Sequence, residues 1–207
     1  MRSPAPISFL FLALLLAVVA ATEVPKLLAE QAKTKQLASV LGGAEETFTP
    51  DVRSAIVDCQ VNGPLPDHAC SPGAIFADAT VAQICVPGYT KTVRNVPQSL
   101  KHVVYAEYGL DYHQPTGSYE VDHLIPLALG GSNDIANLFP EAAEPAPGFH
   151  EKDIVELYLH DEMCAGHIDL HTAQDRIAHD WLTIYQNMPA DDITRIKSEF
   201  RNWADTN

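Results

Sequence analysis

Basic residues are scarce in this chain of 207 residues. It holds 13 lysines and arginines against 27 aspartates and glutamates, which gives a formal net charge of −14. Proteins that hold polyanions usually present a basic face, so this balance argues against tight, non-specific binding of DNA. One small basic group is present, formed by Lys91, Arg94, Lys101 and His102. A protein that approaches phosphates through divalent cations is still compatible with this charge, because the cations bring positive charge of their own.

Long apolar runs are also scarce. The exception is residues 7–20, ISFLFLALLLAVVA, which follow Arg2 and end in small residues. This order is typical of a secretory signal peptide. The alternative is a membrane anchor, but the run is about 14 residues long and a membrane span needs roughly 20. The sequence therefore predicts a signal peptide over residues 1–21 and an exported chain, secreted or periplasmic, that is free of the membrane after cleavage.

No two of the four cysteines form a CxxC motif, which argues against a structural zinc site built on thiolates. An even number of cysteines in an exported chain favours disulfides, and four cysteines allow three pairings. The local choice is Cys59–Cys70, which leaves Cys85–Cys164 as a long-range pair. Four free thiols would be a poor alternative in an oxidising compartment.

Repeats and low-complexity tracts are absent, and the length suits one domain with additions. We expect a leader and loop region over residues 22–68, the main domain over 69–188 and a helical tail over 189–207. Alternating apolar residues around Pro87-Gly88 predict two short strands within residues 79–94. Helical spacing predicts helices from Pro97 to Gly109, over 149–165 and over 170–187, the last capped by Asp169.

The stretch SYEVDHLIPLALGGSNDIANLF, residues 118–139, places the polar pair Asp122-His123 in an apolar, strand-like run. Polar groups are costly to bury without partners, so this pair either stabilises a turn or belongs to a site. Gly130-Gly131 predicts a turn with positive φ. A short strand then follows Asn137, and a helix begins near His150. This strand-turn-strand-helix order is a compact way to hold one divalent metal ion.

The run EVDHLIPLALGGSNDIANL resembles the HNH endonucleases. The matching elements are the Asp-His pair, Pro126, the Gly-Gly turn and Asn137-Leu138. The wider run from about Cys70 to Met188 resembles exported bacterial proteins of this family, through fragments such as CVPGYTKTVRNVP and YEVDHLIPLALGGSN. The resemblance implies an α+β fold: a ββα-metal core of the HNH type, with flanking helices and a disulfide-stapled N-terminal hairpin region.

The same resemblance implies a metal-dependent endonuclease that hydrolyses phosphodiester bonds in DNA, with RNA left open. His123 would be the general base, since an imidazole can take a proton from water at neutral pH. Asp122 would bind one divalent ion, Mg²⁺, Mn²⁺ or Zn²⁺, which neutralises charge on the phosphate. Asn137 would either fix the loop that orients the base or approach the metal.

The remaining candidates lie around this motif. His150 starts the predicted helix, beyond the extra loop PEAAEPAPG, and would be the second metal ligand. Its alternative is a solvent-facing histidine. Glu120 precedes Asp122 by two residues on the same strand face and is a further candidate ligand. Lys152 and Arg94 are expected to contact a substrate phosphate.

Two other functions fit the same sequence. One is a non-catalytic exported binding or structural module that keeps the HNH fold, which the charge of −14 and the displaced His150 favour. The other is a hydrolase that acts on a different phosphate ester.

Overall fold

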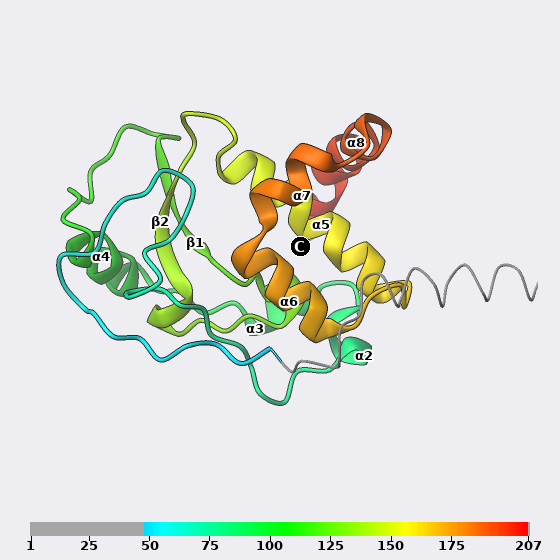
Figure 1. The fold of residues 1–207 in the computed structure, drawn as a ribbon, viewed down its shortest axis with the longest axis horizontal. Coiled ribbons are helices and arrows are strands. Elements are labelled where there is room, and N and C mark those ends of the chain that lie inside the picture. Colours follow the sequence, from blue (N-terminus) through cyan, green and yellow to red (C-terminus); the bar gives the residue numbers. More distant parts are fainter. Residues whose placement is uncertain (1–47, 207) are drawn as a thin grey trace, which may run out of the picture. The chain divides into compact units, whose positions relative to one another are not determined.

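An antiparallel hairpin and the long helix that follows it organise this protein, as seen in a computed structural model (Figure 1). The structure describes residues 48–206, and their side chains as far as residue 199. The predicted signal peptide, residues 1–21, and the first part of the predicted leader lie outside the described residues. The elements in chain order are α2 (Val81–Ile84), α3 (Tyr89–Val93), α4 (Gln98–Glu107), β1 (Tyr119–His123), the 3-10 helices η1 (Leu127–Leu129) and η2 (Ile135–Asn137), β2 (Leu138–Ala142), α5 (Phe149–Cys164), α6 (Leu170–His179), α7 (Trp181–Asn187) and α8 (Ala190–Thr206).

The predicted strand-turn-strand-helix order is confirmed, and the fold is α+β. Strands β1 and β2 pair antiparallel, with Tyr119 opposite Ala142 and His123 opposite Leu138. The first strand is shorter than predicted, because it ends at His123 and the apolar run continues into η1. Helix α4 lies on one side of the hairpin and helices α5 to α8 lie on the other (Figure 1).

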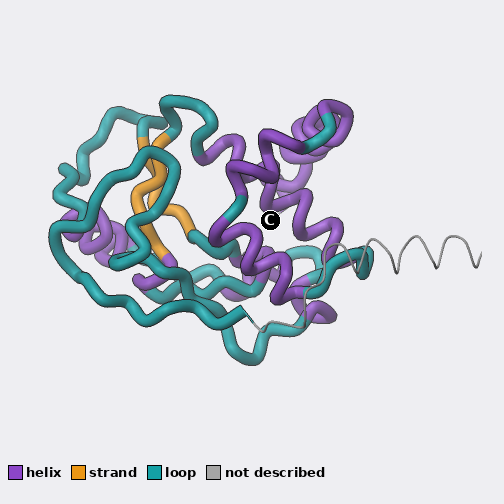
Figure 2. Tube along the Cα trace, in the orientation of Figure 1, coloured by secondary structure: helices purple, strands orange, loops and turns teal. Residues whose placement is uncertain are grey.

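The prediction of two strands within residues 79–94 is wrong. This segment forms the short helices α2 and α3, and the sheet of the described residues holds β1 and β2 alone (Figure 2). Thr80 and Gln83 form a capping box that starts α2, and Gly88 turns the chain into α3 with φ of 86°. The alternating apolar residues do not share a buried face, since Ile84 is buried while Val81 and Val86 are exposed.

The helices after residue 95 follow the predicted pattern with one break. Helix α4 starts after Pro97, and Gly109 follows its end with φ of 64°. The segment 170–187 divides at Asp180 into α6 and α7, so the prediction of one continuous helix is wrong there. Asp169 caps α6 as predicted, through a hydrogen bond from the Thr172 amide. The break has no proline or glycine at it, and Trp181 directly after it is buried, so tertiary packing overrides the helical pattern.

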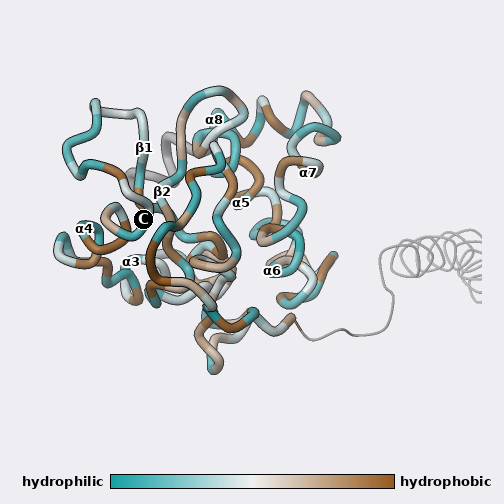
Figure 3. The backbone as a smooth tube through the Cα atoms, turned by 60° about the vertical axis from the view of Figure 1, so that its left-hand side comes forward, coloured by the Kyte–Doolittle hydropathy of each residue, from teal (hydrophilic) through white to brown (hydrophobic). Residues whose placement is uncertain are grey.

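The apolar core gathers around α5, which packs against α6, α7 and α8. Val155 and Leu159 of α5 are buried with Ile177, Trp181 and Ile196 of the three other helices. Hydrophobic and hydrophilic stretches alternate along the helices (Figure 3). The segment predicted as a helical tail contains α8, and this helix packs on α5.

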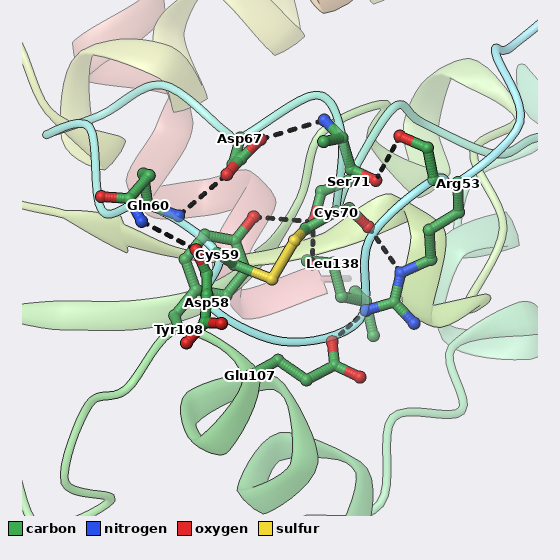
Figure 4. Close-up of a disulfide and its surroundings, with 12 residues drawn as sticks. Arg53, Asp58, Cys59, Gln60, Asp67, Cys70, Ser71, Glu107, Tyr108 and Leu138 are labelled. Carbon is green, nitrogen blue, oxygen red and sulfur yellow. Dashed lines mark hydrogen bonds and ion pairs between the residues drawn. A yellow bond between two sulfur atoms is a disulfide. The ribbon is translucent and has the colours of Figure 1, made fainter.

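Both predicted disulfides, Cys59–Cys70 and Cys85–Cys164, are confirmed. The first closes a loop of the N-terminal region and is surrounded by hydrogen bonds (Figure 4). The Asp67 carboxylate accepts hydrogen bonds from the amides of Gln60 and Ala69, which are the neighbours of the two cysteines. The second disulfide joins the end of α2 to the last residue of α5.

Residues 48–71 are tied to α4 and β2. Arg53 forms an ion pair with Glu107, and the Cys59 amide donates to the Glu107 carbonyl. Ser71 donates to the Leu138 carbonyl at 2.7 Å and lies 2.9 Å from the Tyr108 hydroxyl (Figure 4). Within residues 48–206, no helix has the length and apolar character that crossing a membrane requires.

Candidate functional site

Asn137 fixes the loop between the two strands. Its Oδ1 accepts from the Ile125 amide at 2.9 Å, and its Nδ2 donates to the carbonyls of Ile125 and Ser132. The side chain is fully buried, so each of these backbone groups gains a partner that water could not supply. These contacts make Asn137 the residue that holds the loop after His123, which agrees with the first of the two positions expected for it.

The two glycines of this loop serve different needs. Gly130 has φ of 75°, as predicted. Gly131 does not lie in the positive-φ region, so the prediction is wrong for this residue. A Cβ at Gly131 would meet the Ile125 carbonyl oxygen at 1.7 Å, which leaves no room for any side chain. Gly131 is therefore required by the close approach of the backbone.

Asn133 determines which nitrogen of His123 carries the proton. The Asn133 Nδ2 donates to the Val93 carbonyl at 2.7 Å, and its Oδ1 accepts from the Asn95 amide at 3.0 Å. These two bonds fix the orientation of the amide, so Oδ1 faces His123 Nε2 at 3.3 Å. Nε2 is consequently the protonated nitrogen, and Nδ1 keeps its lone pair with no hydrogen bond from the described residues.

His123 is neutral at neutral pH. It ends β1 with 3% of its surface exposed. Burial lowers the pKa of His123 to about 4, and the positive charge of Arg94 also lowers it. The nearby Asp122 carboxylate acts in the opposite direction but does not compensate for burial. A neutral imidazole with a free Nδ1 can accept a proton.

Asp122 and His123 have different neighbours although they are adjacent. The Asp122 carboxylate faces α5, where Lys152 Nζ lies 2.5 Å from Oδ2. Lys152 Nζ also donates to Glu156 Oε1 at 2.6 Å and to the His123 carbonyl at 2.9 Å. Three acceptors therefore satisfy the three protons of the ammonium.

Lys152 is fully enclosed, with no exposed surface. A side chain in this position contacts the protein's own carboxylates and not a phosphate in solution. The prediction that Lys152 contacts substrate is not supported by this placement. Its pKa lies well above the ordinary value: burial alone would lower it, but the carboxylates of Asp122, Glu156 and Glu141 outweigh burial.

The carboxylates around Lys152 outnumber it. We call them the carboxylate cluster: Glu120, Asp122, Glu141, Asp153 and Glu156. Glu120 and Glu141 are directly opposite in the strand register, so both lie on the face of the hairpin that carries Asp122. Asp153 and Glu156 come from α5.

Proton affinity in the carboxylate cluster is unusually high. Burial raises the pKa of Glu120 to about 7, that of Glu156 to about 7 and that of Asp153 to about 9, and neighbouring carboxylates add to each shift. Asp122 differs, because the Lys152 ammonium overcomes the effect of burial and holds the pKa of Asp122 below its ordinary value. The cluster thus carries more acidic groups than its one lysine can neutralise.

Glu141 is the least satisfied member of the cluster. It is fully buried, and neither of its carboxylate oxygens has a hydrogen-bond partner among the described residues. The nearest cation is Lys152 Nζ, 3.8 Å from Oε2. Burial raises the pKa of Glu141 well above its ordinary value, so the folded protein favours its protonated form, which can share the proton with Asp122.

His150 does not join the site. It is exposed at the start of α5, and its ring centroid lies 4.2 Å from that of Phe149. Lys152 of the same helix faces the hairpin, and residues two positions apart on a helix point about 200° away from each other. The prediction of His150 as the second metal ligand is therefore not supported by its position.

The chemistry of the donors limits which metal ion could be held. The carboxylate cluster offers oxygen ligands, which suit Mg²⁺ and Mn²⁺ better than Zn²⁺. Within the described residues, the group whose potential ligand atoms already lie within 4.8 Å of one another is Cys85, His160 and Cys164, away from this cluster. Ligands for a hard cation are present around Asp122, and Lys152 offsets part of their negative charge.

Arg94 lies at the exposed edge of the site. Its charge acts on both His123 and Glu156, while the charge of Lys101 acts on Glu120. Two members of the small basic group therefore border the carboxylate cluster. This position is compatible with the predicted phosphate contact of Arg94.

Comparison of the chain with protein-family models, curated proteins and solved structures finds no match. The resemblance to the HNH endonucleases therefore depends on the residues quoted from the sequence alone.

Sequence reasoning missed Asn133, Glu141, Asp153 and Glu156. The signal for Glu156 was present, because Lys152 and Glu156 have the i, i+4 spacing of a helical ion pair. Glu141 can be assigned to the carboxylate cluster once the register of the hairpin is known, because it lies opposite Glu120. Asn133 has no comparable signal, since its role depends on contacts with residues 93 and 95.

Proposed function

We propose that this protein hydrolyses phosphodiester bonds in nucleic acid with the help of a hard divalent cation. The observation that carries the proposal is a neutral, buried His123 with a fixed tautomer, next to carboxylates in excess of their counter-ion. The substrate is DNA, with RNA as a second candidate, and the location is secreted or periplasmic. Two disulfides are typical of exported proteins, which supports that location.

The protein's own residues have distinct roles in this proposal. His123 accepts a proton from the attacking water at Nδ1, and Asn133 keeps the opposite nitrogen protonated. Asp122 and Glu120, with Glu156, provide oxygen ligands. A divalent cation bound to them supplies charge neutralisation and Lewis acidity at the phosphate. Arg94 attracts the substrate backbone at the rim.

The ββα-metal architecture of the HNH family belongs to the same proposal. Its support is the confirmed order of strand, turn, strand and helix, together with Asn137 in the loop after the Asp-His pair. The displaced His150 is the departure from that pattern, and cluster carboxylates replace it as ligands.

One observation favours a second function, a non-catalytic binding module. Lys152 places a cation inside the carboxylate cluster, where it makes three hydrogen bonds. An internal counter-ion of this kind can stabilise the hairpin and α5 without any metal. In this alternative the site is a structural ion-pair network, and the protein does not cleave nucleic acid.

Incubation of the purified chain with supercoiled plasmid distinguishes the nuclease from the non-catalytic binding module. The reactions contain Mg²⁺, Mn²⁺, Zn²⁺ or EDTA, and the variants are His123→Ala and His150→Ala. We expect cleavage with Mg²⁺ or Mn²⁺, loss of cleavage in EDTA and in His123→Ala, and retention in His150→Ala. Cleavage that persists in EDTA or in His123→Ala contradicts the mechanism, and a folded protein that binds the cations without cleaving supports the module.

The same assay with a chromogenic small phosphodiester tests substrate class. If the small ester is cleaved while plasmid, RNA and linear DNA are not, the site acts on a different phosphate ester.

A further inference from the structure

A group of residues with side chains that can ligate a metal ion lies at the C-terminal end of α5. Cys164 is the last residue of the helix, and His160 is one turn before it, so both project from the same helix face. Cys85 directly follows α2 and is disulfide-bonded to Cys164. The ligand atoms of all three residues lie within 4.8 Å of one another.

His160 has a sulfur beside one ring nitrogen and a carboxylate beside the other. Its Nε2 lies 3.5 Å from Cys164 Sγ, and its Nδ1 lies 3.7 Å from Asp161 Oδ1. A metal-bound histidine usually donates its second ring N–H to a carboxylate, and Asp161 is the carboxylate beside Nδ1 of His160. The His160 side chain retains 21% of its exposed surface, so ions and small reductants can reach it.

We propose that Cys85, Cys164 and His160 bind one Zn²⁺ ion when the Cys85–Cys164 disulfide is reduced. A dithiol reductant supplies two electrons and two protons: the S–S bond breaks, two thiols form and the reductant becomes a cyclic disulfide. Zn²⁺ then replaces the two thiol protons, which pass to solvent. Two thiolates and an imidazole are a donor set that Zn²⁺ prefers, with a water completing four ligands.

The ligand atoms need to move only a short distance to bind the ion. Tetrahedral ligands at about 2.3 Å for sulfur and 2.0 Å for nitrogen lie about 3.5 to 3.8 Å apart. The Cys164 to His160 separation already has this value. The two sulfurs must separate from bonding distance to about 3.8 Å, which side-chain rotation about Cys85 and Cys164 can provide while the Cα atoms stay near 5.7 Å.

The other disulfide is a matched control. Cys59 and Cys70 are also bonded to each other, but they are buried and have no histidine in a comparable group. A reductant breaks both disulfides and frees four thiols. We assign metal binding to Cys85 and Cys164 and not to Cys59 and Cys70.

Titration of the full chain with Co²⁺ as a spectroscopic probe for Zn²⁺ tests the proposal, in a phosphine reductant and without it. We expect thiolate-to-cobalt absorption at one Co²⁺ per reduced chain, displaced by Zn²⁺ and absent from the oxidised chain. His160→Ala should weaken Co²⁺ binding about tenfold or more, and Asp161→Asn about tenfold. Cys59→Ser/Cys70→Ser should keep the band, and Cys85→Ser/Cys164→Ser should lose it.

His160→Ala retains both disulfides, so its oxidised form provides a folding check. The proposal is overturned if the reduced chain shows no thiolate band, if His160→Ala binds as tightly as the parent, or if the band follows the Cys59 and Cys70 pair. Binding of Co²⁺ by the carboxylate cluster produces no sulfur band, so the outcome does not depend on the proposed nuclease activity.

Discussion

The Lys152 ammonium and the Asp122 carboxylate form a short ion pair, 2.5 Å from Nζ to Oδ2, across 30 positions of sequence. This contact joins the first strand of the hairpin to the helix that follows it. It also brings the one fully buried lysine of the described residues to the residue that the sequence pattern presents as a metal ligand. The position of Lys152 therefore bears on both stability and function.

Replacing Lys152 with Met should destabilise the fold by about 3 to 5 kcal/mol, because Asp122 and Glu156 lose their counter-charge while still largely buried. Urea unfolding measures the loss. A second change, Glu156→Gln, should recover part of it in the Lys152→Met background. Lys91→Met, at an exposed position, is the control and should change stability by less than about 0.5 kcal/mol. Equal effects of the two lysine variants would refute the structural role of the ion pair.

Asn133→Ala should remove the contact that fixes the tautomer of His123. Long-range proton–nitrogen NMR spectra should show protonated Nε2 in the parent chain and a mixture of tautomers in the variant. If His123 is the base, the cleavage rate falls about tenfold, part of the contribution of a general base. Asn133→Asp keeps an acceptor for Nε2 and adds negative charge, so the pKa of His123 should rise above about 4. An unchanged spectrum in Asn133→Ala contradicts the assignment.

Stability should fall as pH rises from 7 to 9 in metal-free protein. Burial, followed by the charges of Glu156 and Asp122, raises the pKa of Asp153 from 3.8 to about 9, so the folded state holds a proton there that the unfolded state has lost. Stabilisation of this kind is present at low pH and is lost as pH rises through the folded pKa.

His123 acts in the opposite sense and only in the acidic part of the range over which Asp153 acts, so it does not affect the interval from pH 7 to 9. Its pKa falls from 6.5 to about 4, so its contribution is lost as pH falls through that range and is constant above it. Thermal unfolding in EDTA should therefore show that Asp153→Asn flattens the decline above pH 7, by up to about 1.4 kcal/mol per pH unit. Asp51→Asn, at an exposed position, should leave the slope unchanged. A slope that Asp153→Asn does not alter rules out this origin.

The two disulfides should differ in their effect on stability. Cys85–Cys164 spans 79 positions and Cys59–Cys70 spans 11. Chain entropy then predicts that replacing the first pair with serine costs about 4.5 kcal/mol and replacing the second about 2.8 kcal/mol. Guanidinium unfolding of the two double variants measures both. The reverse order would show that local contacts of the 59–70 loop outweigh chain entropy.

Arg94→Ala should weaken DNA binding if the site acts on nucleic acid. Loss of one phosphate contact reduces the slope of log affinity against log salt concentration by about one. Arg195→Ala on α8 is the control, since that side chain pairs with Asp161 and Glu199. Fluorescence anisotropy in EDTA measures binding without cleavage. Identical salt slopes in the parent and Arg94→Ala would remove Arg94 from the interface.

Local sequence patterns predicted several turns, helix ends and both disulfides. The Gly-Gly turn before Asn137, the cap at Asp169 and the pairing of the cysteines are visible from residues that act on near neighbours or on a small set of partners. The segment 79–94 was predicted as strands from apolar alternation, but a strand needs a partner and no other segment of the described fold pairs with it. The capping box at Thr80 was the stronger local signal.

The charge arrangement of the site could not be predicted in the same way. Lys152 reaches Asp122 because the loop between β2 and α5 turns the first helical residues toward the hairpin. That same turn directs His150 to solvent. Neither outcome follows from spacing. Residues 140–142 of the predicted loop PEAAEPAPG belong to β2, and the shorter loop 143–148 sets the rotation of α5 about its axis. Cross-strand placement of Glu141 likewise depends on the register.

The hydrogen bonds of Asp67 have a consequence for how the chain oxidises. A chain delivered from its N-terminus presents Cys59, Cys70 and Cys85 well before Cys164, and Cys70 is almost as near to Cys85 as to Cys59 in sequence. Loop entropy separates these two choices by only about 0.3 kcal/mol, too little to prevent mispairing. Asp67 holds the amides next to Cys59 and Cys70 on one carboxylate. In the folded chain these contacts hold the two segments that carry Cys59 and Cys70 side by side, which favours this pairing over the alternative of Cys70 with Cys85.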